Sequence, residues 1–335
     1  MKKKCIIYLL KVVSAALVAF IILNALCVFY YNIPAHCVSK THSTNHIWQQ
    51  GKFYSRATEG FASGVIDANG FNNLQTYEKG EIDLLMMGSS HMEAFNVAQD
   101  KNTVVLLNEK FKNDKLDMNA YNIGVSGHHF LICLNNLNNA IDEFAPRKYV
   151  VIETGYVVPD ATTINQMLNG TLTPDSSSSS VIIDFLQRIP YLRLLYAQIK
   201  NTVTNNKNEV PVQSNQDSEV NKTELYENLG KLIKQSTKKC QDAGVQVIIF
   251  YNCEISIDEQ GKVKDRVDLD DVNAFKEACD KNDVIFVDMY DAFASMYEKT
   301  KKLPRGFANT QAGAGHINEV GHQVIADEIY AIINK

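Results

Sequence analysis

The amino-acid sequence predicts an α/β protein built on a five-stranded parallel sheet, with one transmembrane helix ahead of it. Three observations predict this: five short apolar runs, helical patterns between them, and a 20-residue apolar stretch near the start of the chain. Apolar runs that alternate with amphipathic helices are typical of a parallel sheet covered on both faces. With 335 residues, 45% of them hydrophobic, the chain can bury such a core as one large domain or two small ones.

The first element is the apolar stretch Val12–Tyr31, which is interrupted only by Ser14 and Asn24. At about 1.5 Å per residue, a helix of this length spans a hydrocarbon core of roughly 30 Å. A buried core helix would show a polar face, and a removable signal peptide would end in small residues, whereas this stretch ends in bulky ones. The cluster Lys2–Lys4 should stay in the cytoplasm. We therefore interpret residues 1–31 as a signal anchor with the rest of the chain outside the cell membrane.

The charge balance argues against nucleic-acid binding. Four of the 33 basic residues and none of the 38 acidic ones lie in residues 1–31, which leaves 29 basic against 38 acidic residues in the remainder. A phosphate backbone requires a clustered basic footprint. The seven cysteines show no paired spacing that would indicate zinc, and Cys133 and Cys279 fall on apolar helix faces, where core filling is the usual role.

The remaining elements follow in order along the chain. Leucines in the predicted helix Thr223–Asp242 recur at helical spacing, and Gly244 follows as a stop signal. The predicted strands are Ile82–Met87, Ala120–Ile123, Tyr149–Ile152, Val245–Tyr251 and Val284–Val287. The predicted helices are Thr103–Asn113, His129–Phe144, Thr223–Asp242, Leu269–Asp280 and Val320–Asn334.

Two segments interrupt this alternation. Residues 32–80 are polar and predict a juxtamembrane stalk, partly laid against the domain that spans residues 81–335. Residues 157–222 form an insertion that is much longer than a crossover needs, with the serine run Ser176–Ser180, an apolar helical piece at Val181–Ile199 and the polar stretch Asn201–Lys222. Because it starts at the carboxyl end of a strand, the insertion is a lid over the ligand site or, for its polar part, a disordered tether.

Three short motifs could carry chemistry. The first predicted strand runs into Gly88-Ser89-Ser90, which places a serine hydroxyl at the edge of the sheet, although the same residues also make ordinary turns. The second strand ends in a glycine-rich turn that closes with Gly127, where backbone amides can approach a ligand. Before the last helix, His316 lies in a third glycine-rich loop, and a neutral imidazole is the usual base for a serine hydroxyl.

Together these motifs resemble the SGNH or GDSL hydrolase superfamily, from about residue 81 to the end of the chain. The resemblance implies a three-layer α/β/α fold with a flavodoxin-like sheet. It also implies that Ser90 is the nucleophile, that His316 is the general base, and that the backbone amides of Ser90 and Gly127 bind the oxyanion. Asn122 begins the second motif in this comparison, and Ser89 replaces the usual aspartate.

Two positions depart from the family pattern. The asparagine that would complete the oxyanion hole is Val157, so Tyr156, Thr154 or Asn165 would have to substitute for it. One missing donor costs on the order of 3 kcal/mol of transition-state stabilisation. The aspartate three residues before the histidine is Gly313, which leaves a Ser-His dyad or an acid from elsewhere, such as Glu153 or a residue of Asp258–Asp271.

The other histidines near this sheet edge are His91, His128 and His129. Four imidazoles could bind a metal, but no recognised ligand spacing supports that, so we interpret His91 and His128 as polar lining of the site and expect neither metal nor cofactor. His322 on the last helix is interpreted as structural. Asp288 and Asp291 are explained by helix capping and turn formation.

The leading prediction is a membrane-anchored serine esterase or O-acyltransferase that acts on acyl esters of cell-envelope glycans, with acetyl the favoured group. The resemblance implies an acylated polysaccharide or cell-wall polymer as partner, an integral-membrane acyltransferase as a further one, and a bacterial cell membrane as the location. The alternative is a catalytically silent envelope protein that keeps the fold to bind a glycan or scaffold a membrane complex. Metal-dependent hydrolysis through His91, His128 and His316 is a third, weaker alternative.

Overall fold

The computed structural model describes residues 2–30, 36–38, 46–55, 59–172, 189–205 and 221–334. Its centre is a parallel sheet in which β5 lies between β6 and β7, and β8 and β9 follow on the β7 side. This is the flavodoxin-like order 2-1-3-4-5. The predicted sheet is confirmed strand by strand. Its strands are β5 (Leu84–Met87), β6 (Ala120–Asn122), β7 (Tyr149–Thr154), β8 (Gln246–Tyr251) and β9 (Ile285–Asp288).

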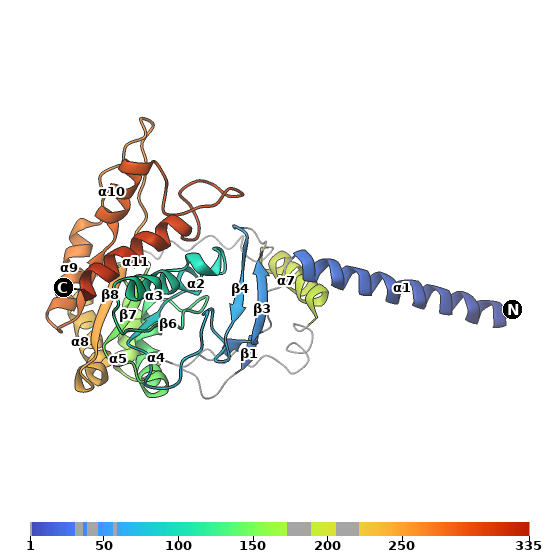
Figure 1. Cartoon of the computed structure of the whole chain (residues 1–335), viewed down its shortest axis with the longest axis horizontal. Coiled ribbons are helices and arrows are strands. Elements are labelled where there is room, and N and C mark those ends of the chain that lie inside the picture. The colour runs from blue at the N-terminus through green and yellow to red at the C-terminus, as the bar shows by residue number, and fades with distance from the viewer. Residues whose placement is uncertain are drawn as a thin grey trace.

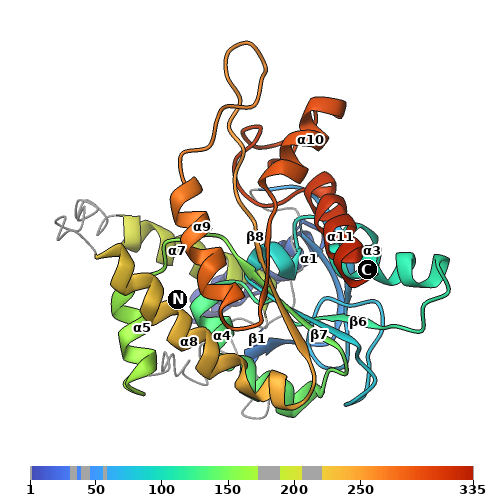
Figure 2. The same ribbon diagram turned by 90° about the vertical axis from the view of Figure 1, so that its left-hand side faces the viewer.

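Helices cover both faces of the sheet and complete three layers, as Figure 2 shows. The sequence attributed Asp288 and Asp291 to helix capping and turn formation: Asp288 accepts from the Tyr290 N–H at 3.1 Å at the start of α10 (Tyr290–Thr300), and Asp291 lies in the first turn of that helix, for which no bounds were predicted. One layer consists of α4 (Phe130–Phe144), α5 (Ala161–Leu168), α8 (Lys222–Asp242) and α9 (Leu269–Asp280). The other consists of α3 (Thr103–Asn113), α10 (Tyr290–Thr300) and α11 (Glu319–Ile333).

The strands read as continuous apolar runs because both of their faces are buried. In β5, Leu85 and Met87 point into the core below α4 and α8, while Leu84 and Met86 point into the core below α3 and α11. All four side chains are buried. Two covered faces leave no side of the strand for polar residues, which explains why the strands show no alternation.

The first strand of the sheet, β5, is also where the order of the strands reverses. Its neighbours are β6 on one side and β7 on the other. In open α/β sheets, the crevice for a ligand lies at the carboxyl ends of the strands at such a switch point. The chain leaves β5 through Gly88 and Ser89 and enters the short helix α2 (Ser90–Glu93). Ser90 therefore lies at the place where the topology of the sheet favours a ligand site.

The part of the chain ahead of the sheet is helical and then hairpin-like. Helix α1 (Lys2–Tyr30) projects away from the body in Figure 1, and its segment Lys4–Cys27 is long and apolar enough to cross a membrane by length and composition. Strand β1 (His36–Val38) pairs antiparallel with β2 (His46–Trp48). Strands β3 (Gly51–Ser55) and β4 (Ala62–Ile66) pair in the same way as a hairpin.

The β3–β4 hairpin is seated on the α/β domain, although the sequence predicted a stalk only partly laid against it. Phe53 and Ile66 bury their side chains with Phe95 in a small separate core. The side-chain amide of Gln99, in the short 3-10 helix η1 (Gln99–Lys101), accepts from the Val65 N–H at 2.9 Å and donates to the Val65 carbonyl at 2.7 Å. These contacts fix the hairpin in place relative to the sheet.

The insertion is described only in part. Helix α5 opens it, and helix α7 (Pro190–Asn205) lies at the base of α1 in Figure 1. The Tyr191 N–H donates to the Asn24 side-chain oxygen of α1 at 3.2 Å, and the ring of Tyr191 packs edge-on against Phe20. The serine run and residues 206–220 of the polar stretch lie outside the described residues. The contacts of α7 are thus with the apolar helix, at the extracytoplasmic end of the predicted anchor.

Four cysteines of the sheet domain are buried, free thiols: Cys133, Cys240, Cys253 and Cys279. Cys133 and Cys279 fill the core as predicted.

Candidate active site

Three side chains from distant parts of the chain meet at the carboxyl edge of the sheet. The Ser90 hydroxyl lies 2.9 Å from Nε2 of His316, and Nδ1 of the same imidazole lies 2.5 Å from Oε2 of Glu59. A proton on Nδ1, facing the carboxylate, leaves Nε2 free to accept the proton of the serine hydroxyl. This is the geometry of a nucleophile, a base and an orienting acid.

The acid of this relay is Glu59, which the sequence did not single out. Burial opposes ionisation of Glu59, but hydrogen bonds from the His316 backbone N–H, at 2.9 Å, and from its ring outweigh that effect and hold the pKa of the carboxyl below its ordinary value. A group held ionised beside the ring can stabilise an imidazolium. The acid is therefore neither Glu153 nor a residue of Asp258–Asp271.

The turn that carries Glu59 is held by specific contacts. The Asn96 side chain donates to the Glu59 carbonyl at 3.2 Å, and the Gly60 N–H donates to the Asn309 side chain at 2.9 Å. Gly60 has a φ of +67°, and a Cβ on it would lie 2.3 Å from the Asn96 carbonyl oxygen. On the other side, a Cβ on Gly315 would lie 2.5 Å from a carboxylate oxygen of Glu59. Glycine at both positions is what lets the carboxylate approach His316.

The nucleophile turn is braced by Glu153. Both the N–H and the hydroxyl of Ser89 donate to Oε2 of Glu153, at 2.8 and 2.9 Å. The Ser89 hydroxyl also accepts from the His91 N–H at 3.3 Å and so caps α2. Ser89, at the position next to Ser90, is thus bound to a carboxylate and to the first turn of α2.

A buried polar network continues from Glu153 to the loop of His316. The Asn252 side chain donates to Oε1 of Glu153 at 2.8 Å. Nη2 of Arg305 donates to the carbonyl and the side-chain oxygen of Asn252, at 2.8 and 2.9 Å. Nη1 of Arg305 then reaches the Gly315 carbonyl at 3.0 Å. Because Glu153, Asn252 and Arg305 are all at most 6% exposed, this network is a rigid link between the nucleophile turn and the base loop.

The second motif lies against the helix that carries Ser90. The Val125 N–H donates to the Gly88 carbonyl at 3.0 Å, and Gly124 is so close to α2 that a Cβ would meet the Glu93 nitrogen at 2.7 Å. Gly127 follows in an exposed turn with a φ of +85° and open space around its Cα. Asn122 is buried, and its side-chain amide donates to the Met92 carbonyl and accepts from the Gly124 N–H. Asn122 therefore braces the motif and does not line the site.

The two histidines predicted to line the site, His91 and His128, differ in their contacts. His91 uses both ring nitrogens: Nδ1 accepts from the Ile317 N–H at 3.3 Å and Nε2 lies 3.5 Å from Nη1 of Arg305. Burial, with the charges of Arg305 and His316, lowers the pKa of His91 to about 3, so the ring is neutral. His128 is half-buried, and its N–H donates to the Val125 carbonyl within the turn. Within the described ranges, no group of three or more His, Cys, Asp or Glu side chains is arranged to hold a metal ion.

In the turn after β7, the absent asparagine is not replaced by another side-chain donor to the site. Val157 is buried in the core, and the Thr154 hydroxyl donates to the Tyr156 carbonyl at 2.5 Å. Tyr156 packs against the same core, and its hydroxyl interacts with the Leu131 backbone. Asn165 lies on α5, where it accepts from Asn228 of α8. None of the three predicted substitutes, Thr154, Tyr156 and Asn165, has a contact with Ser90 in the described part of the chain.

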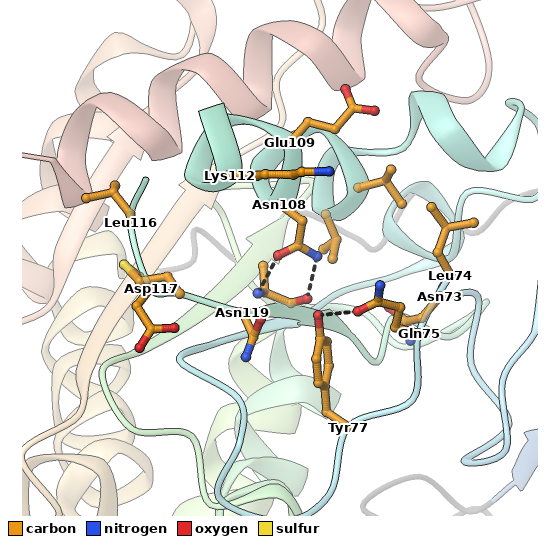
Figure 3. A pocket seen from close by; sticks show the side chains of 14 residues that line it. Asn73, Leu74, Gln75, Tyr77, Asn108, Glu109, Lys112, Leu116, Asp117 and Asn119 are labelled. Carbon is orange, nitrogen blue, oxygen red and sulfur yellow. Dashed lines mark hydrogen bonds between the residues drawn. The ribbon is translucent and has the colours of Figure 1, made fainter. Parts of the chain in front are cut away.

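A separate hollow of about 460 Å³ lies away from the triad, between residues 73–77 and α3 (Figure 3). Its polar groups are largely paired. The Asn108 side chain bonds both the N–H and the carbonyl of Ala120, and the Tyr77 hydroxyl donates to Gln75. None of the three triad residues lines this hollow.

No protein-family model and no curated protein matches this sequence. Solved structures of esterases and of a GDSL-like lipase match over about three quarters of the chain. The psychrotrophic esterase EstA from Pseudoalteromonas sp. is 17% identical with a TM-score of 0.40, and the match covers 75% of this chain and 97% of that one. The acetyl xylan esterase AlAXEase is 14% identical with a TM-score of 0.43, and the match covers 75% of this chain and 99% of that one. A candidate GDSL-like lipase from Parabacteroides merdae is 14% identical with a TM-score of 0.39, and the match covers 75% of this chain and 94% of that one.

Proposed function

We propose that the protein is a membrane-anchored serine esterase or O-acyltransferase of the SGNH type. Its substrates are acyl esters, above all acetyl esters, of cell-envelope glycans. The observation that carries this proposal is the continuous relay from the Ser90 hydroxyl through His316 to the Glu59 carboxylate. The fold alone would not carry it, since one fold hosts many functions.

The chemistry runs in two balanced steps. Ser90 Oγ attacks the ester carbonyl while its proton passes to Nε2 of His316, and the imidazolium is stabilised by Glu59. Collapse of the tetrahedral intermediate breaks the ester bond, and the leaving alcohol takes that proton, which leaves an acyl-serine. Water or a sugar hydroxyl then attacks the acyl-serine and gives its proton to His316. Collapse of this second intermediate breaks the bond between Ser90 Oγ and the acyl carbon, Ser90 Oγ takes the proton back from His316, and the carboxylic acid or the new sugar ester leaves. The backbone N–H groups of Ser90 and Gly127 are the proposed donors to the oxyanion.

The proposed location depends on α1. This helix carries Lys2–Lys4 at its start, which favours a cytoplasmic amino terminus, and α7 contacts it near the opposite end. The triad would then lie outside the membrane, where envelope glycans are. Alkaline carbonate extraction of cell membranes tests the anchor: the intact chain should remain in the pellet. Release into the supernatant would show that α1 is removed or does not span.

A serine-reactive fluorophosphonate probe tests the enzyme. We expect labelling of the full chain and hydrolysis of 4-nitrophenyl acetate, and loss of both in Ser90→Ala. Ser295→Ala, which removes an exposed serine on α10, is the matched control and should behave as the parent chain does. If the parent chain shows neither labelling nor hydrolysis, the alternative of a catalytically silent glycan-binding or scaffolding protein replaces this proposal.

A further inference from the structure

A second cavity, of about 560 Å³, is lined by His91, the residue after Ser90, while none of the three triad residues lines it. His91 and Gly155 line its near side, and the long β8–α9 connection, which extends away from the body as an orange loop in Figure 2, lines its far side. Tyr251, Arg266, Tyr290 and Arg305 complete the wall.

The cavity is connected to the base by short contacts. The ring of His91 lies 5.0 Å from that of His316, centroid to centroid, and the His91 ring also accepts from the backbone next to His316. Arg305 donates to the carbonyl of Gly315, the residue before His316. His91 and Arg305 therefore line the cavity and also contact the loop that carries His316, which places the cavity next to that loop.

The lining is polar and its formal charges balance. Three cationic residues, Lys264, Arg266 and Arg305, face three acidic ones, Glu254, Asp265 and Asp268, and His91 is neutral. An anionic ligand would find no excess of positive charge there. A long apolar acyl chain fits poorly as well, because it would cover charged groups without giving them hydrogen bonds.

Two guanidinium groups in this wall still have unused donors. Among the described residues, Nε of Arg305 and Nη2 of Arg266 are buried and have no hydrogen-bond partner, and the two side chains are only 6% and 12% exposed. Both atoms are closed off from solvent, so a ligand in the cavity meets the charge of these groups and not these two N–H groups.

The same wall offers rigid aromatic surface. The Arg266 guanidinium lies over the ring of Tyr290, 4.6 Å from its centroid, and ion pairs with Asp268 and Asp288. The Tyr251 hydroxyl donates to Asp268 at 3.0 Å. Ligand pockets of a few hundred Å³ combine such apolar faces with a few fixed polar groups. The cavity is far larger than an acetyl group and suits one or two sugar rings.

We propose that this cavity is the subsite for the alcohol half of the ester, and that it accepts a neutral, hydroxyl-rich sugar residue. The assignment rests on the proposed function, since it places the sugar relative to the ester that Ser90 attacks. The acyl group would then lie on the opposite side of the Ser90 hydroxyl.

The test compares two substrates on the full chain in detergent micelles. Methyl 6-O-acetylglucoside fills the sugar subsite, whereas 4-nitrophenyl acetate has no sugar. We expect Tyr290→Ala and Arg266→Lys each to lower the ratio of kcat/KM for the glucoside to that for the aryl acetate at least tenfold, mainly through KM. Tyr330→Ala, which removes a tyrosine on the distant part of α11, is the matched control and should leave this ratio unchanged.

The outcomes separate the two proposals. If hydrolysis of the aryl acetate depends on Ser90 but the ratio is unchanged in both variants, or the parent chain does not cleave the glucoside, the subsite is wrong and the esterase stands. If acetylated methyl glucuronoside, which is anionic, is preferred over the glucoside, a neutral sugar is the wrong ligand. If neither ester is cleaved in a Ser90-dependent way, the proposed function itself fails.

Discussion

Glu59→Gln is the most direct test of the relay, because it changes one oxygen to nitrogen in the side chain that orients His316. Oε2 of Glu59 accepts from both the ring and the backbone N–H of His316. A glutamine oxygen in that place can keep both hydrogen bonds. The variant therefore removes the negative charge while it preserves the contacts, and the change in rate reports on the charge.

The magnitude follows from the geometry. The two side chains are 20% and 31% exposed, so an effective dielectric constant of about 20 is appropriate. A unit charge about 4 Å from the centre of the imidazolium then contributes about 4 kcal/mol. This stabilisation exists only while His316 is protonated, in the transition state, so kcat should fall about 10³-fold and KM should change little.

The assay is steady-state hydrolysis of 4-nitrophenyl acetate by the full chain in detergent micelles, with Ser90→Ala as the background rate. Glu109→Gln, which neutralises an exposed carboxylate on α3, controls for the change in net charge and should retain the parent rate. A kcat for Glu59→Gln within threefold of the parent value would refute the assignment of Glu59 as the orienting acid.

Three other predictions concern the supports of the site. Asn252→Ala interrupts the buried hydrogen-bond network between Glu153 and Arg305. It should lower kcat about 10- to 100-fold by displacing the loops that carry Ser90 and His316. A kcat within twofold of the parent value in steady-state kinetics would contradict this. Burial raises the pKa of Glu93 from 4.5 to about 7, so the folded chain retains a proton that the unfolded chain loses. The free energy of unfolding should therefore fall by about 3 kcal/mol as the pH rises from 4.5 to 7, and Glu93→Gln should abolish that slope in thermal melts; an unchanged slope counts against it. A chain that begins at residue 32 should keep the esterase rate of the full chain. A chain that begins at residue 81 lacks Glu59, and its kcat should be at least 10³-fold lower. Equal rates for the two shortened chains would show that the hairpin is dispensable.

The sheet could be predicted from the sequence because its strands are buried on both faces. Each predicted strand is present with its ends shifted by at most two residues, and the helices Thr103–Asn113 and Leu269–Asp280 have the predicted bounds. Helix α10 was not predicted because it follows β9 almost without a loop and buries little beyond Phe293 and Tyr297. With so narrow an apolar face, the helical period is weak.

The site was predictable where its residues lie next to elements with a clear apolar pattern. Ser90 directly follows the turn after the buried strand β5, and His316 lies in the loop just before helix α11. Glu59 lies in a hairpin outside the alternating pattern, and its polar neighbours resemble a stalk. The available signal was the pair of apolar positions Phe53 and Ile66 flanking the dipeptide Glu59-Gly60, which is what a short hairpin with a fixed turn requires.

Glu59 brings a residue from the segment between α1 and the sheet into the contact with His316. The hairpin that carries Glu59 follows α1 after fewer than thirty residues, and it is held by its own small core and by Gln99. An acid donated by the last loop would move together with His316, whereas this one comes from a separate hairpin whose buried side chains include Phe53, Ala62 and Ile66. Opening of that segment would leave Ser90 and His316 in contact but remove the charge that stabilises the imidazolium. Under the proposed function, activity therefore depends on the state of the juxtamembrane segment as well as on the sheet domain.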